Sequence, residues 1–191
     1  MSQHATQLLA LLRRTDALPW ATHALPPAGT AAAPGAGWLQ ATDSLTQRLR
    51  ERFGAVTVEV LAEGERAATD GFLGSPDRPA APNPPEGLPD ATVPPLPVWE
   101  RCVCLHAGGQ PRIAARTCIP QWSAAQPWRA VARLGRQPLG ELLFTRPGIE
   151  RGRLTYAVAS ATPWLPARRC RYVWQGAALD LTEVFLDAAL A

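Results

Sequence analysis

The stretch WERCVCLHAGGQPRIAARTCIP, residues 99–120, constrains the fold more than any other part of the sequence. Its two arms alternate and are rich in β-formers, and Gly108-Gly109 stands where a two-residue hairpin turn is favoured. With the glycines at the centre of the turn, the register places Arg101 directly opposite Arg116. Like charges that face each other on a sheet are unfavourable. The pair therefore predicts an anion held between the two guanidinium groups.

The same register predicts which residues share the face of Arg101. They are Trp99, Val103 and Leu105 on the first arm and Cys118, Arg116, Ala114 and Arg112 on the second. Two arginines on an otherwise apolar face are typical of an anion pocket, because a guanidinium binds a carboxylate through two charge-assisted hydrogen bonds. Two other interpretations stay open: the face is exposed to solvent, or each arginine pairs with an internal carboxylate. Trp99 is a candidate to contact a planar ring.

Composition narrows the class of protein. The chain of 191 residues, 47% hydrophobic and 18% charged, fits one globular domain over 1–191. The net charge of +3 comes from arginine and is too small to indicate nucleic-acid binding. No apolar run approaches the roughly 20 residues that span a membrane. The N-terminus lacks the order of a signal peptide and predicts an amphipathic helix.

The four cysteines are predicted to be reduced. Cys102 and Cys104 share one face of a strand, a poor geometry for a disulfide, and no export signal is present. Buried cysteines then act as small apolar residues. A metal site built from Cys102, Cys104 and His106 lacks a second pair of ligands at a recognisable spacing.

The remaining segments predict an α+β fold, a single antiparallel sheet with helices inserted between hairpins. The expected order is an irregular connection (19–37), a helix (42–54) with a Ser44/Gln47 capping box, a strand (56–65), a Pro-rich loop (66–97), the hairpin, two short helices (123–145), and a second hairpin (153–187) turning near Gln175-Gly176. No dinucleotide-binding or P-loop glycine motif is present.

Glu183 is the second chemical signal. Its strand face reads Leu179, Leu181, Glu183, Phe185, so one carboxylate stands in an apolar row. Burial there would raise its pKa and suit it to proton transfer near neutral pH. The alternative is an ion pair with Arg169 or Arg171 on the preceding strand. No nucleophile elbow or zinc-protease motif accompanies it.

Taken in order, several segments resemble the chorismate pyruvate-lyase family of ubiquinone biosynthesis. They are DSLTQRL (43–49), VTVEVLAEG (56–64), the W-x-R of 99–101 with ARTCIP (115–120), LGRQPLGELLF (134–144) and LTEVFL (181–186). The segment 146–167 matches poorly, and Leu45 stands where the family can have Met. The resemblance implies a chorismate-lyase-like antiparallel sheet with a buried site under helical flaps.

The resemblance also implies which residues act. Arg101 would hold a ligand carboxylate, Glu183 would reach the ring hydroxyl, Leu45 and Leu139 would contact the ligand through their main chain, and Arg116 would line the pocket. Arg101 and Glu183 are the expected catalytic residues. The substrate would be chorismate, the products 4-hydroxybenzoate and pyruvate, with no metal or organic cofactor, in a cytoplasmic monomer. The alternative is a non-catalytic, sensor-type domain that binds a small aromatic acid.

Overall fold

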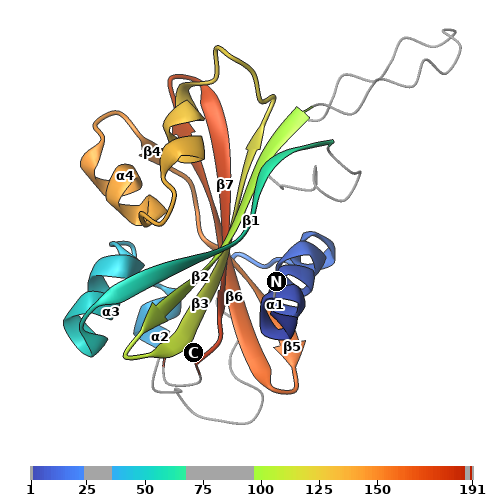
Figure 1. Cartoon of the computed structure of the whole chain (residues 1–191), viewed down its shortest axis with the longest axis vertical. Coiled ribbons are helices and arrows are strands. Elements are labelled where there is room, and N and C mark those ends of the chain that lie inside the picture. The colour runs from blue at the N-terminus through green and yellow to red at the C-terminus, as the bar shows by residue number, and fades with distance from the viewer. Residues whose placement is uncertain (1, 24–35, 68–96, 188–189, 191) are drawn as a thin grey trace, which may run out of the picture.

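The computed structural model describes residues 2–23, 36–67, 97–187 and 190 (Figure 1). The helices are α1 (Gln3–Arg14), η1 (Thr15–Ala17), α2 (Ala36–Leu39), α3 (Leu45–Phe53), η3 (Pro127–Arg133) and α4 (Leu139–Thr145). The strands are β1 (Val56–Ala67), β2 (Pro97–Ala107), β3 (Gln110–Pro120), β4 (Glu150–Arg151), β5 (Thr155–Ala161), β6 (Trp164–Trp174) and β7 (Ala177–Phe185).

All seven strands belong to one antiparallel sheet, which confirms the predicted α+β class. The strands follow the order β1-β2-β3-β7-β6-β4, and β5 also pairs with β6. Both predicted hairpins are present, β2–β3 and β6–β7, and the second turns at Gln175-Gly176. Strands β4 and β5 lie within 146–167, the segment that matches the family poorly, and were not predicted individually.

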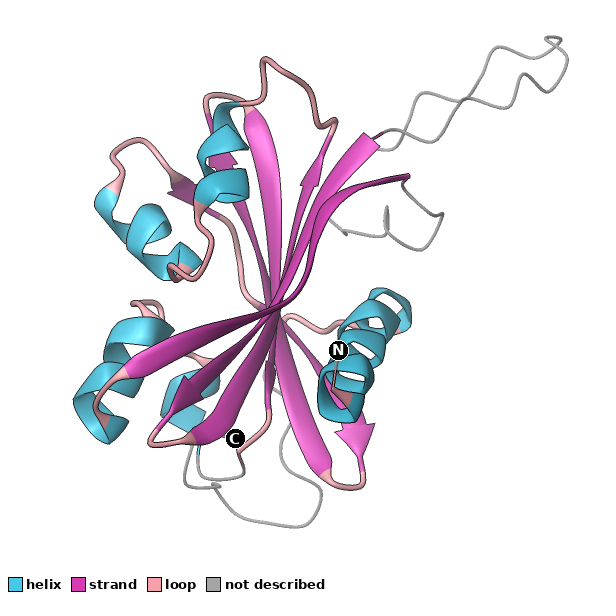
Figure 2. Ribbon diagram, in the orientation of Figure 1, coloured by secondary structure: helices cyan, strands magenta, loops and turns pink. Residues whose placement is uncertain are grey.

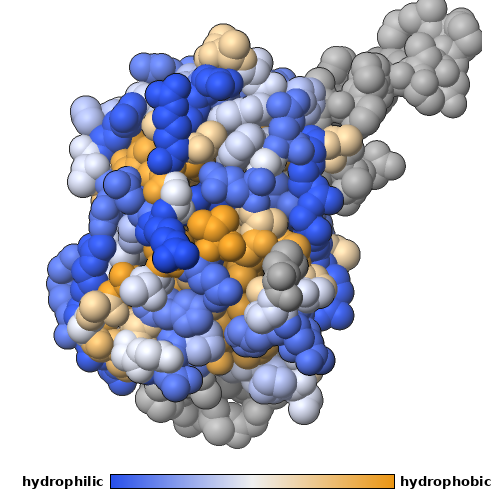
Figure 3. Space-filling view, in the orientation of Figure 1, coloured by the Kyte–Doolittle hydropathy of each residue, from blue (hydrophilic) through white to orange (hydrophobic). Residues whose placement is uncertain are grey.

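Helices cover both faces of the sheet (Figure 2). Helix α1 lies on one face, where Leu8, Leu11 and Leu12 are buried against the strands. Helices α2, α3, η3 and α4 cover the other face, which holds the larger apolar core. In the space-filling view, hydrophilic side chains surround apolar ones that gather at the centre of the visible surface (Figure 3).

Helix α3 begins and ends as the sequence predicts. The Ser44 side chain accepts a hydrogen bond from the Gln47 backbone N–H, and Gly54 follows the last turn with φ of 83°. Leu45 and Leu49 point into the core. Of the two predicted helices in 123–145, the first is the 3₁₀ helix η3 and the second is α4.

The β2–β3 register differs from the predicted one because of a bulge. Near the turn the predicted pairs form, with His106 opposite Pro111, but Leu105 then pairs with Ile113. Arg112 is the extra residue on β3. Because successive side chains alternate between faces, one added residue turns the rest of a strand over.

The bulge overturns the predicted arginine pair. Thr117, not Arg116, lies opposite Arg101, and Arg116 lies opposite Cys102. The face of Arg101 therefore carries Ile113, Ala115, Thr117 and Ile119 from β3, in place of the even-numbered residues that the sequence predicted.

The four cysteines are free and buried, as predicted. Cys102 and Cys104 pack under α1. Burial raises the pKa of Cys102 and of Cys104 to about 12. At neutral pH these protonated thiols pack as small apolar side chains.

Two segments that the sequence predicts to be irregular lie only partly within the described residues. The Pro-rich loop 66–97 falls outside the described residues except at its ends, where Arg66, Ala67 and Pro97 extend β1 and β2. The connection 19–37 is likewise described only in part, and it ends in α2. Among the described helices, none has the length and apolar character to cross a membrane.

Candidate active site

A cavity lies between the sheet and the helices α3 and α4. It encloses about 560 Å³ of space between atoms, a figure that includes the open solvent at its mouth. The polar side chains that line it include Arg101, Thr117, Arg168, Tyr172 and Glu183. Apolar side chains supply much of the remaining wall, among them Val58, Val103, Leu105, Leu143, Phe144 and Leu181. A mostly apolar pocket with a few converging polar groups suits a small, partly charged ring.

The sheet register explains how these groups face the same space. Arg101 on β2 lies opposite Thr117 on β3, and Ala115 on β3 lies opposite Glu183 on β7. The strands that carry Arg101 and Glu183 are thus two spacings apart in the sheet, about 10 Å between their backbones. The small residues Ala115 and Thr117 lie between them and leave room for a ligand.

Arg101 is buried, with 2% of its side chain exposed, and is firmly held. Its Nη1 donates to Glu63 Oε2 at 3.0 Å, and its Nη2 donates to the carbonyls of Gly135 (2.8 Å) and Gln137 (3.2 Å). Burial lowers the pKa of Arg101, and the neighbouring Glu63 opposes that shift. Within the described part of the chain, Nε–H and the second Nη1–H have no acceptor, so two donors remain for a ligand.

Glu183 forms an ion pair with a residue that the sequence reasoning did not name. Arg168 Nε donates to Glu183 Oε2 at 2.6 Å, and the two residues are directly opposed on β6 and β7. The predicted alternative, a cross-strand ion pair, is therefore present, but with Arg168 in place of Arg169 or Arg171. The carboxylate is 12% exposed, and Oε1 accepts no hydrogen bond from any described residue.

Arg168 was missed although its signal was in the sequence. With Gln175-Gly176 at the centre of the β6–β7 turn, strict pairing places Arg168 opposite Glu183, and no bulge disturbs it. The turn itself was predicted. The register of that turn, extended along both strands to Glu183, predicts the pair.

Leu45 and Leu139 both line the cavity from its helical side. Leu45 is the first residue of α3 and Leu139 the first of α4, so the two helix starts meet over the site. Gly140 lies in this contact: a Cβ there would be 3.2 Å from Ser44 Oγ and 3.3 Å from Thr46 Oγ1. Leu45 and Leu139 thus line the same cavity as Arg101 and Glu183.

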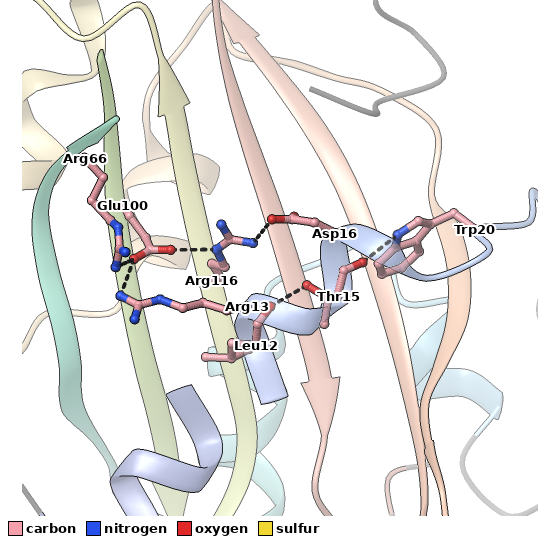
Figure 4. A network of polar contacts seen from close by, with 8 residues as sticks. All are labelled: Leu12, Arg13, Thr15, Asp16, Trp20, Arg66, Glu100 and Arg116. Carbon is pink, nitrogen blue, oxygen red and sulfur yellow. Dashed lines mark hydrogen bonds and ion pairs between the residues drawn. The ribbon is translucent and has the colours of Figure 1, made fainter. Parts of the chain in front are cut away.

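Arg116 is not part of this cavity. It lies on the opposite face, where its Nε donates to Glu100 at 3.0 Å and its Nη1 donates to Asp16 at 2.7 Å (Figure 4). Glu100 also accepts from Arg13 of α1 and from Arg66 of β1. The internal-carboxylate interpretation is the correct one for Arg116, whose network ties α1 and η1 to the sheet.

Trp99 does not line the cavity either. It stacks on Trp122 with ring centroids 4.8 Å apart, and the pair packs against the core on the face of Arg101.

Comparisons of the sequence with known proteins agree on one family. A sequence profile described as chorismate lyase matches residues 85–190. A chorismate pyruvate-lyase of Salmonella arizonae is 34% identical over 99% of this chain and 98% of its own length. A probable chorismate pyruvate-lyase of Hydrogenovibrio crunogenus is 38% identical over 48% of this chain and 56% of its own length. Among solved structures, the C-terminal domain of the histidine utilization repressor from Pseudomonas syringae aligns with a TM-score of 0.39 and 12% identity, covering 69% of this chain and 91% of that domain.

Proposed function

Because this chain belongs to the chorismate lyase family, we propose that it eliminates pyruvate from chorismate and releases 4-hydroxybenzoate for ubiquinone biosynthesis. The observation that carries the proposal is the cavity bounded by Arg101 on β2 and by Glu183 on β7. A guanidinium and a carboxylate on strands two positions apart in the sheet suit a ligand with a carboxylate at one end of a ring and a hydroxyl at the other.

The reaction breaks two bonds of the substrate. The carbon that bears the hydroxyl loses its proton, and the neighbouring ether carbon–oxygen bond breaks, so that the ring becomes aromatic. The departing enolpyruvate takes up one proton at its methylene carbon and becomes pyruvate. Atoms and electrons balance without an oxidant or reductant. Aromatisation drives the reaction, so the protein has mainly to orient the ring and manage charge.

In this proposal Arg101 binds the ring carboxylate through an N–H group that its partners among the described residues leave free. Glu183 accepts a hydrogen bond from the ring hydroxyl at Oε1 and assists the loss of the adjacent proton. The main chain at Leu45 and Leu139 contacts the ring from the starts of α3 and α4. The helices over the cavity exclude water from the reacting ring.

Product identification is the direct test. Purified protein is incubated with chorismate, the aromatic product is identified by chromatography against the 3- and 4-hydroxy isomers, and pyruvate is measured with lactate dehydrogenase. The expected result is 4-hydroxybenzoate and pyruvate in equal amounts. Folded protein that binds 4-hydroxybenzoate but forms no product would contradict the proposal and favour the sensor-type alternative.

The proposal includes a cytoplasmic monomer that needs no metal or organic cofactor. Protein dialysed against EDTA is expected to keep its full turnover, because the roles above use only side chains and main chain. Light scattering coupled to gel filtration is expected to give a mass near 20.5 kDa. Loss of activity on chelation that added metal restores would contradict the cofactor-free mechanism.

A further inference from the structure

Arg168 is buried in the wall of the cavity, yet it has no part in the ligand contacts proposed above. Only 4% of its side chain is exposed. Its Nε donates to Glu183, and its Nη1 donates to the carbonyls of Trp38 (3.2 Å), Leu39 (3.3 Å) and Ala41 (2.7 Å). One guanidinium thus joins the carboxylate on the sheet to the main chain that leads from α2 toward α3.

This arrangement fixes the carboxylate in one orientation. A planar guanidinium that donates to several acceptors at once has little freedom to rotate. The bond between Nε and Oε2 engages one oxygen of Glu183, while Oε1 accepts no hydrogen bond from the described residues. Oε1 of Glu183 is the oxygen that the proposed reaction uses.

We propose that Arg168 is a positioning residue, which holds Glu183 so that Oε1 faces the substrate and which ties that orientation to the segment ahead of α3. The inference rests on the proposed lyase function. It adds a residue that acts through Glu183 and that binds neither product nor substrate.

The same segment carries other groups of the site. Asp43 and Leu45, both of which line the cavity, follow closely after Ala41, whose carbonyl accepts the 2.7 Å bond from Arg168. Arg151 also donates to this stretch, at the carbonyls of Thr42 and Ala41. Arg168 therefore connects the helical side of the cavity with the strand that supplies the carboxylate.

A double-mutant cycle between Arg168→Met and Glu183→Gln tests the proposal. Each single variant is expected to lower kcat about 10²- to 10⁴-fold, the usual contribution of a general acid or base. If Arg168 acts through Glu183, the double variant is no slower than Glu183→Gln alone, because residues that work as a unit are not additive. In Arg168→Met, KM and the affinity for 4-hydroxybenzoate are expected to change less than about threefold.

Arg171→Met is the matched control. Arg171 is on the same strand and makes a cross-strand pair with Asp180 through two 2.8 Å bonds, but on the opposite face. Its loss is expected to lower thermal stability and to leave kcat within twofold. A drop in kcat equal to that of Arg168→Met would show that any broken β6–β7 ion pair has the same effect, and would overturn the proposal.

Removing Arg168 takes one donor from each of three carbonyls, of which Ala41 keeps its bond from Arg151 and Trp38 keeps its bond from the Ala41 N–H; this loss can prevent folding. Arg168→Lys then carries the test, because an ammonium group cannot reach the carboxylate and the carbonyls in the planar geometry of a guanidinium. The expected result is a kcat at least tenfold lower with unchanged affinity for 4-hydroxybenzoate. Unchanged kcat in Arg168→Lys, or effects that add fully to those of Glu183→Gln, would overturn the proposal. Failure of the wild type to turn over chorismate would instead overturn the lyase function.

Discussion

Arg101 and Arg116 carry the same charge on neighbouring strands, yet side-chain alternation sends them to opposite faces and gives them different partners. Arg101 lines the cavity, and two of its N–H groups have no acceptor in the part of the chain that the structure describes. Arg116 is surrounded by Glu100 and Asp16. Burial acts to lower the pKa of Arg116, but its neighbours Cys118, Asp16 and Glu100 hold that pKa above the ordinary value. One arginine is thus available to a ligand and the other stabilises the fold.

Paired substitutions separate these two roles. Arg101→Met is expected to weaken 4-hydroxybenzoate binding by about 2–5 kcal/mol, because the ligand carboxylate loses a desolvated partner. Arg116→Met is expected to leave that affinity unchanged and to cost about 3 kcal/mol of folding stability, since it breaks a buried ion pair. Calorimetric titration and thermal denaturation of both variants measure the contrast. Equal losses of affinity would contradict the assignment of the two arginines to different faces.

The buried thiols predict the response of the protein to alkaline pH. The pKa of Cys102 and of Cys104 is raised by burial to about 12, above the ordinary value of 9.0, so the folded state binds these protons more tightly than the unfolded state. Their stabilising contribution is complete below pH 9 and is lost as the pH rises from 9 toward 12.

Two measurements check this expectation. Urea denaturation at pH 8 and at pH 10.5 is expected to give a lower free energy of unfolding at the higher pH. The variant Cys102→Ala/Cys104→Ala, which lacks both thiols, should show a smaller decrease. In the native wild type at pH 8, a thiol reagent is expected to label these cysteines far more slowly than in urea. Rapid labelling of the native protein would contradict their burial.

At the scale of the elements, the contact between α3 and α4 closes the cavity. Gly140→Ala places a methyl group 3.2 Å from Ser44 Oγ and 3.3 Å from Thr46 Oγ1, so the two helix starts have to separate by a few tenths of an ångström. Alanine in place of glycine also favours the helix by roughly 1 kcal/mol, which offsets the crowding. We expect little change in melting temperature but a several-fold weaker affinity for 4-hydroxybenzoate.

Gly37→Ala is the control for that substitution. Gly37 is also helical, and a Cβ there meets no atom within 4 Å. It should leave ligand affinity unchanged. An equal effect of the two substitutions on affinity would show that the α3–α4 contact does not govern the site.

The elements also show how far the sequence alone leads. Alternation predicted β1, β2, β3 and β7, and the Ser44 cap predicted α3, because these signals are local. Leu45, Leu139, Arg101 and Glu183 meet at one cavity, as the family resemblance implied. Local signals did not reveal the bulge at Arg112, which makes contacts far along the chain: its carbonyl accepts from the Leu186 N–H, and its side chain forms an ion pair with Asp187. The error in the placement of Arg116 follows from that one residue.

For the whole molecule, ligand binding and folding are linked. A ligand that binds only the folded state at 100 times its Kd adds about 2.7 kcal/mol to the free energy of unfolding. For a chain of this size that corresponds to a rise in melting temperature of roughly 5–10 °C. We expect 4-hydroxybenzoate to produce this rise in the wild type and none in Arg101→Met.

A ring compound without a carboxylate is the control for that rise in melting temperature. Phenol keeps the ring and its hydroxyl and lacks the carboxylate, so it is expected to leave the melting temperature unchanged at the same concentration. A rise with phenol equal to that with 4-hydroxybenzoate would show that the cavity recognises the ring and its hydroxyl without a carboxylate contact at Arg101.

The bulge at Arg112 has a consequence for how this sequence can change over time. It sets which of two alternating sets of side chains on β3 meets the ligand. A single-residue deletion or insertion between the turn and Arg116 would move Arg116 to the ligand side and expel Ala115 and Thr117 from it. Length changes in this strand are therefore tolerated only in steps of two, or when a second change restores the count. Substitutions have no such restriction.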